Sequence, residues 1–250
     1  MRHLLAAENQ HVLARLARSS TLIAFDFDGT LASIVADRDR AALRPSTRGL
    51  LTRLCARYPC AVITGRSRAD VEARLEGAPI RYIVGNHGLE SVDLPTSADQ
   101  VMAVVRPLIE AALCQHGGLD VEDKQYSLAV HYRNSLAKRR ARMAIHHVVA
   151  TLPVPMRVVP GKLVINILPR GAPHKGHALL ELRQREAARM ALYVGDDVTD
   201  EDVFELEDEG SLVAARVGHS KRSAAPYFLR DQREIDLLLA SLLELRPLGS

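Results

Sequence analysis

Carboxylates are concentrated in two short segments that lie far apart in the sequence. The first is Asp26-Phe27-Asp28-Gly29-Thr30, and the second runs from 195 to 202 and contains Asp196, Asp197 and Asp200. A carboxylate can attack phosphorus as a nucleophile. A second carboxylate two residues later can give a proton to the leaving oxygen and then take one from water. Oxygen ligands of this kind suit Mg²⁺, so the residue types indicate phosphoryl transfer assisted by a divalent cation.

The alternative interpretation of the first segment is structural: an acidic turn, or a calcium-binding loop. The spacing of a full EF-hand loop is missing from residues 26–31, which argues against calcium. Gly29 lets the chain turn sharply away from the carboxylates without placing a side chain in the cleft. The segment therefore favours catalysis over a purely structural turn.

Two single residues have the chemistry needed to hold a phosphate. Thr64 follows the apolar run 61–63, and Lys175 precedes an apolar helical stripe at 178–182. Taken alone, a threonine before a glycine is more typical of a turn, and a lone lysine is more typical of a surface. Asp-x-Asp-Gly-Thr, threonine, lysine and Gly-Asp-Asp occur here in this order, and their joint occurrence favours a phosphatase.

These residues stand where predicted strands end. Short apolar runs predict strands at 21–25, 61–63, 82–84, 191–194 and 211–215, and apolar periodicity predicts helices at 4–18 and 234–245. Ser67 with Asp70, and Thr199 with Asp202, have the spacing of helix caps. Strands that alternate with helices imply a Rossmann-like, doubly wound parallel sheet, in which ligands bind at the carboxyl ends of the strands.

The middle of the chain has a different pattern. Helical stripes at 97–112 and 136–151 alternate with two predicted hairpins, one at 119–133 and one at 156–168. We therefore expect a two-layer α+β cap domain at 97–173, inserted into a catalytic core made of 1–96 and 174–250.

Composition excludes several classes of protein. The 250 residues carry 33 basic and 30 acidic side chains, a balance that does not suggest a polyanion-binding protein. A basic run, Lys138, Arg139, Arg140 and Arg142, lacks the aromatic residues that stack on bases, so a solvated helix face is the better interpretation than nucleic-acid binding. The three cysteines have no C-x-x-C spacing and indicate neither a disulfide framework nor a zinc site.

No apolar run has the length of a membrane span, and the first 20 residues lack the apolar region of a signal peptide. We therefore expect a cytoplasmic protein, a monomer or weak oligomer, with a small-molecule partner and without nucleic-acid or membrane partners.

With these motifs the chain resembles the trehalose-6-phosphate phosphatase family of the haloacid dehalogenase superfamily. The resemblance extends over roughly 22–204. It is carried by the segments 26–31, 62–66, 85–90, 122–124, 131–133, 161–162 and 195–201. It implies the core fold of that superfamily, hydrolysis of a sugar phosphate through an aspartyl-phosphate intermediate, and Mg²⁺ as cofactor.

The resemblance also implies roles for the core residues. Asp26 would be the nucleophile and Asp28 the general acid/base. Asp26, the backbone carbonyl of Asp28, and Asp196 would bind Mg²⁺. Asp197 and Asp200 would be outer carboxylates or would position Lys175. Thr64 and Lys175 would hold the transferring phosphoryl group, with Arg66 beside it.

Side chains alternate across a strand, which would collect the polar residues of the insert on one face of its sheet. Those residues are Glu122, Lys124, His131, Arg133, Lys162 and Asn166. The face is either an ordinary solvated surface or a lid that binds sugar hydroxyls, and the resemblance favours the lid. It also implies that Asn86 and His87 bind substrate.

One position departs from the family pattern, because Asn166 stands where a glutamate is common. Alternatives are therefore a phosphatase for sucrose phosphate or a hexose phosphate, and a phosphomutase of the same superfamily. A non-catalytic sugar-phosphate sensor is a further alternative, but it is disfavoured because Asp26 and Asp28 are both intact.

Overall fold

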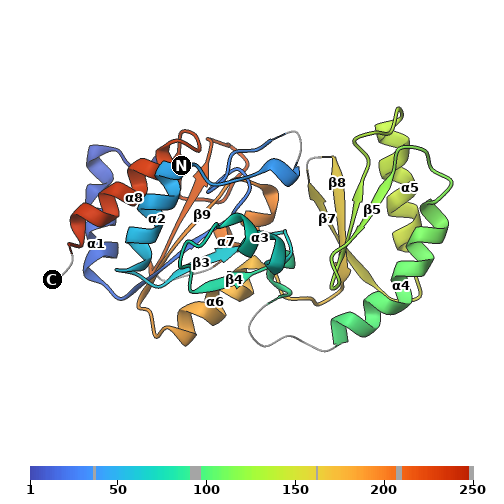
Figure 1. Cartoon of the computed structure of the whole chain (residues 1–250), viewed down its shortest axis with the longest axis horizontal. Coiled ribbons are helices and arrows are strands. Elements are labelled where there is room, and N and C mark those ends of the chain that lie inside the picture. Colours follow the sequence, from blue (N-terminus) through green and yellow to red (C-terminus); the bar gives the residue numbers. More distant parts are fainter. Residues whose placement is uncertain (36–37, 91–96, 162, 207–209, 248–250) are drawn as a thin grey trace. The chain divides into compact units, whose positions relative to one another are not determined.

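The computed structural model describes residues 1–35, 38–90, 97–161, 163–206 and 210–247. The chain divides into two compact units, one of Met1–Ser91 with His174–Ser250 and one of Val92–Pro173 (Figure 1). The second boundary coincides with the expected one at 173/174. The first lies a few residues before the expected 96/97, in a stretch outside the described residues.

A seven-stranded sheet forms the centre of the first unit, in the order β1-β11-β10-β9-β2-β3-β4, and all six strand pairs are parallel. The strands are β1 (Arg2–His3), β2 (Thr21–Phe25), β3 (Cys60–Ile63), β4 (Tyr82–Val84), β9 (Met190–Gly195), β10 (Leu212–Val217) and β11 (Tyr227–Leu229). Every residue of β2, β3 and β9 is buried, as expected for strands covered on both faces.

Helices cover both faces of this sheet. They are α1 (Gln10–Arg18), α2 (Pro45–Cys55), α3 (Arg68–Arg74), α6 (Lys175–Arg185), α7 (Glu201–Phe204) and α8 (Glu234–Leu245), with short 3-10 turns η1 (Ala7–Asn9), η2 (Arg38–Arg40), η3 (Asn86–Gly88) and η4 (Val198–Asp200). Ile23 and Phe25 of β2 pack in one apolar cluster with α1, α2 and α8, whereas Leu22 and Ala24 pack in another with α6 and α7. The doubly wound parallel core is therefore confirmed (Figure 1).

Three local predictions in the core were wrong. The first helix begins at Gln10 instead of Leu4, and Leu4 instead continues β1 by donating its backbone N–H to Phe228. Strands β1 and β11 were missed. With two residues β1 is too short for periodicity to be recognised, and the run Tyr227–Leu229 was not identified as a strand. The turn η4 begins with a capping box between Asp197 and Asp200, not between Thr199 and Asp202.

The second unit is a two-layer α/β structure, as predicted. Its antiparallel sheet has the order β5-β6-β8-β7. The elements are α4 (Ser97–Leu113), β5 (Asp120–Asp123), β6 (Leu128–His131), α5 (Lys138–Ala150), β7 (Met156–Gly161) and β8 (Val164–Pro169). One face of the sheet, with Val130 and Ile165, packs against Met102 and Ile109 of α4 and Ile145 of α5.

The opposite face of this sheet carries several of the predicted polar residues. Glu122 lies opposite Ala129, which in turn lies opposite Asn166, so these three side chains share a face. His131 is two residues from Ala129 and shares it too. Arg133 does not, because β6 ends at His131 and Arg133 is exposed in the following turn.

Lys162 lies outside the described residues. No helix in the described part of the chain is long and apolar enough to cross a membrane.

Candidate active site

The carboxyl ends of three adjacent strands bring the predicted residues together. Asp26 follows β2, Thr64 follows β3 and Asp196 follows β9. Phe25 is in register with Val62 of β3 and with Val194 of β9, so the three strands end at nearly the same level. Parallel pairing thus assembles segments that are separated by up to 170 residues in the sequence.

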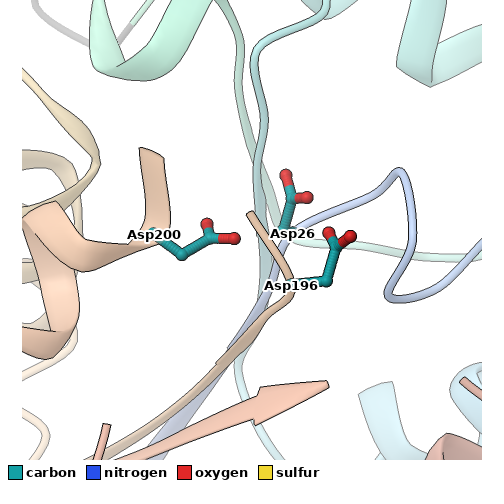
Figure 2. Close-up of side chains that lie close together, drawn as sticks. All are labelled: Asp26, Asp196 and Asp200. Atoms are coloured by element: carbon teal, nitrogen blue, oxygen red, sulfur yellow. The ribbon is translucent and has the colours of Figure 1, made fainter. Parts of the chain in front are cut away.

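Asp26, Asp196 and Asp200 form an acidic cluster at these strand ends (Figure 2). One carboxylate oxygen from each lies within 4.8 Å of the others. Gly29 permits this arrangement, because a Cβ atom there would lie 2.1 Å from Asp196 Oδ2, and its φ of +79° also favours glycine. The glycine of the Asp-x-Asp-Gly pattern is therefore required by the close approach of the Asp196 carboxylate.

Lys175 is buried between two of these carboxylates. Its Nζ donates to Asp26 Oδ1 at 2.8 Å and to Asp200 Oδ1 at 2.7 Å. Burial opposes the charge, but Asp200 and Asp26 outweigh it and raise the pKa of Lys175 above its usual value. Lysine is unfavourable at a helix N-terminus, and these two contacts explain why α6 nevertheless begins with it.

Asp200 is held from three sides. Besides Lys175, its Oδ1 accepts a hydrogen bond from Tyr193 Oη at 2.6 Å, and its Oδ2 accepts one from the Asp197 backbone N–H at 2.9 Å. Of the two roles left open for Asp200, these contacts favour positioning Lys175. Sequence reasoning missed Tyr193, although it is the one polar side chain in the buried run of β9.

The electrostatics of the cluster fit a hard cation. Burial raises the pKa of the Asp26 carboxyl well above its usual range; Lys175 opposes this, and Asp200 and Asp196 add to it. Burial, with Asp200 and Asp197, raises the pKa of Asp196 to about 7. Asp196 Oδ1 is buried and has no hydrogen-bond partner among the described residues. The three carboxylates repel one another, and one of their oxygens lacks a hydrogen-bond donor within the described ranges. A bound cation would relieve both conditions, and carboxylate oxygens are the ligands that Mg²⁺ prefers.

Arg66 contacts Asp28. Its Nε donates to Asp28 Oδ2 at 2.6 Å and its Nη2 to Asp28 Oδ1 at 2.8 Å, while Nη1 donates to Asp70 Oδ2 at 2.7 Å. Arg74 binds the other oxygen of Asp70. A guanidinium that grips a carboxylate with two donors fixes its orientation. Arg66 therefore sets the direction of Asp28, a contact that sequence reasoning did not foresee.

Asn86 and His87 lie in the loop after β4 and support the loop after β3. The His87 N–H donates to the Thr64 carbonyl and the Asn86 N–H to the Arg66 carbonyl, each at 2.8 Å. Both residues have left-handed backbone conformations and buried side chains, and Asn86 also donates to Glu90 at 2.7 Å. A Cβ atom at Gly65 would lie 2.4 Å from His87 Cε1. These contacts brace the loop that carries Thr64 and Arg66, and a role in substrate binding stays a prediction.

Comparison with known proteins gives a consistent result. A family model described as trehalose-phosphatase matches residues 24–233. The trehalose-phosphate phosphatase of Mycobacterium tuberculosis is 35% identical over 223 residues, which cover 83% of this chain and 57% of that protein. That of Mycobacterium avium is 37% identical over 212 residues, covering 79% of this chain and 54% of that one. The chain thus spans just over half the length of these curated relatives.

Solved structures support the fold. The C-terminal domain of trehalose-6-phosphate phosphatase from C. albicans has a TM-score of 0.77 at 23% identity and covers 95% of this chain and 96% of that one. Trehalose-6-phosphate phosphatase from Aspergillus fumigatus has a TM-score of 0.66 at 24% identity and covers 98% and 99%. At these identities the likeness concerns the architecture alone.

The position of Asp26 gives a first prediction. Asp26→Asn should abolish phosphate release while the protein stays folded, because the amide can still accept a hydrogen bond from Lys175 but cannot act as a nucleophile. Circular dichroism and phosphate release would check both parts. Asp99→Asn, an exposed aspartate on α4, is the control and should be fully active. An Asp26→Asn protein with near-normal turnover would rule out the assigned chemistry.

The Arg66 contacts give a second prediction. Arg66→Lys keeps the positive charge but loses the paired donors on Asp28, so proton transfer should slow. Since such transfer contributes about 10²–10⁴-fold, we expect kcat to fall roughly ten- to a hundredfold. Arg74→Lys is the matched control, because Arg74 binds Asp70 without contacting Asp28. An equal loss of kcat in the two variants would show that kcat depends on the contacts of Asp70 and not on the contact between Arg66 and Asp28.

Proposed function

The chain belongs to the trehalose-phosphatase family, and we propose that it hydrolyses trehalose 6-phosphate to trehalose and inorganic phosphate. The observation that carries this proposal is the buried contact between Asp26 and Lys175 at the end of β2, two residues before Asp28. A nucleophile, a charge partner and an acid/base are thereby supplied within one site. Because sugar phosphates are retained inside cells by their charge, we also propose a cytoplasmic location.

The first half of the proposed reaction forms the aspartyl phosphate. The Asp26 carboxylate attacks phosphorus, and the bond from phosphorus to the sugar oxygen breaks. Asp28, oriented by Arg66, gives its proton to that oxygen, so trehalose leaves as a neutral alcohol. Two of the three N–H donors of Lys175 contact described carboxylates, which leaves one for a phosphoryl oxygen beside the Thr64 hydroxyl.

The second half regenerates the enzyme. Asp28 now takes a proton from water, which attacks phosphorus and displaces Asp26 as a free carboxylate. We propose that Asp26, the backbone carbonyl of Asp28, and Asp196 hold Mg²⁺, which supplies the positive charge that offsets repulsion between the phosphate and the carboxylates. Asp197 supports this arrangement through its capping box with Asp200.

We propose further that the polar face of the insert recognises the sugar. On this face Glu122 Oε2 and His131 Nε2 are 2.9 Å apart, and Lys124 Nζ donates to Asn166 Oδ1 at 3.5 Å. Such paired donors and acceptors suit the hydroxyl groups of a sugar. Arg133 and Lys162, and Asn86 and His87 in the core, remain proposed substrate-binding residues.

A second candidate function is hydrolysis of another sugar phosphate, such as sucrose phosphate or a hexose phosphate. Asn166 favours it, because an uncharged amide stands where a glutamate is common in the family. Phosphate release from a panel of sugar phosphates, with and without Mg²⁺, decides between the two candidates. A clear preference for glucose 6-phosphate over trehalose 6-phosphate would favour the second.

The acidic cluster gives a prediction on metal dependence. Excess chelator should abolish phosphate release and added Mg²⁺ should restore it, because oxygen ligands favour Mg²⁺ over zinc. Asp196→Asn should require far more Mg²⁺ for recovery, whereas the Asp99→Asn control should respond like the wild type. Full activity in chelator, with metal removal verified by elemental analysis, would contradict the proposal.

The insert gives a prediction on specificity. Glu122→Ala or Lys124→Ala should lower kcat/KM for trehalose 6-phosphate roughly ten- to a hundredfold, because a lost polar contact leaves a buried group unpaired at about 1–3 kcal/mol. Cleavage of a small aryl phosphate, which has no sugar, should change much less, and Asn166→Ala should show the same split. Glu110→Ala, exposed on α4, is the control. Equal losses on both substrates would refute a role in specificity.

A further inference from the structure

Tyr193 has a buried hydroxyl that packing does not explain. The side chain is fully buried in β9, and Ala24 of β2 and Ala214 of β10 lie opposite it in register. These two small residues make room for a large ring, which also packs edge-on against Phe204 with ring centroids 6.1 Å apart. A phenylalanine would fill the same space, and burying a hydroxyl is unfavourable unless it is hydrogen-bonded.

Among the described residues the hydroxyl bonds to Asp200, which belongs to the acidic cluster. Tyr193 Oη donates to Asp200 Oδ1 at 2.6 Å, the same oxygen that accepts from Lys175 Nζ at 2.7 Å. The Asp197 N–H holds only the other oxygen, Oδ2. Without the Tyr193 hydroxyl, Oδ1 would keep a single donor in the described part of the chain, the Lys175 ammonium group, which Asp26 also binds.

We propose that Tyr193 is a positioning residue for phosphoryl transfer. Its hydroxyl fixes the Asp200 carboxylate, which in turn directs the Lys175 ammonium group at Asp26. The proposal rests on the phosphatase function proposed above. The ring lies on the side of the sheet that α6 and α7 cover, and its hydroxyl connects to the site through Asp200.

Tyr193→Phe tests this inference because it removes one oxygen atom and keeps the ring. We expect kcat to fall about tenfold, the change that corresponds to about 1.4 kcal/mol in barrier height, with KM nearly unchanged. The loss should be the same for trehalose 6-phosphate and for an aryl phosphate, since the core performs the chemistry for both. Circular dichroism would confirm that each sample is fully folded at the assay temperature.

Tyr58→Phe is the matched control. Tyr58 is also buried and its hydroxyl also has a partner, the Leu242 carbonyl at 3.3 Å, but it lies in the apolar cluster on the other face of the sheet. A merely structural role predicts that both variants lose thermal stability and keep kcat. The positioning role predicts that only Tyr193→Phe loses kcat.

A second measurement isolates the path through Asp200. In an Asp200→Ala background, Tyr193→Phe should change kcat less than twofold, because the oxygen that accepts from its hydroxyl has been removed. A full tenfold loss in that background, or unchanged kcat for Tyr193→Phe alone, would overturn the inference while leaving the proposed function intact. A folded wild-type protein that releases phosphate from no substrate would overturn both.

Discussion

The buried ammonium group of Lys175 is the constraint around which the core is organised. A charge removed from water is unfavourable unless it is paired and hydrogen-bonded, and Lys175 meets that condition with Asp26 and Asp200. Those two contacts require the ends of β2 and β9 and the start of α6 to lie together. The order of strands in the sheet, with β9 beside β2, satisfies this requirement, since it brings the two acidic segments to the same lysine.

The surrounding residues secure this arrangement at short range. Gly29 admits the Asp196 carboxylate and Gly65 admits the His87 ring, so neither position has room for a side chain. The Asp28–Arg66–Asp70 contacts orient Asp28, the proposed acid/base, from the neighbouring strand end. The site is therefore preorganised by backbone register and close packing, and its charges are arranged before any substrate arrives.

Much of this was predictable because it depends on short-range patterns. The strand at Thr21–Phe25 and the helix at Glu234–Leu245 were predicted with the bounds that the structure has, and the strand-end placement of Asp26, Thr64 and Asp196 followed from the rule for parallel sheets. Contacts between distant segments were not predictable in this way. The hydroxyl of Tyr193 and the grip of Arg66 on Asp28 join residues seven and 38 positions apart, and neither spacing is a motif. Arg133 was misplaced because alternation was extended beyond the end of β6.

The polar side chains of the two units stand in different backbone settings, and this affects which of them can be substituted without disturbing the fold. In the core, functional groups sit at strand ends and in tight loops, where Gly29 and the buried Lys175 tolerate no change of size or charge. In the insert, Asn166 projects from the middle of β8, and its backbone pairs with Ala129 and Val159 whatever its side chain is. An asparagine can therefore replace a glutamate there without altering register or the apolar face that packs against α4 and α5. We therefore expect variation in substrate to enter through the insert sheet, whereas the proposed phosphoryl-transfer chemistry depends on core residues that are closely packed.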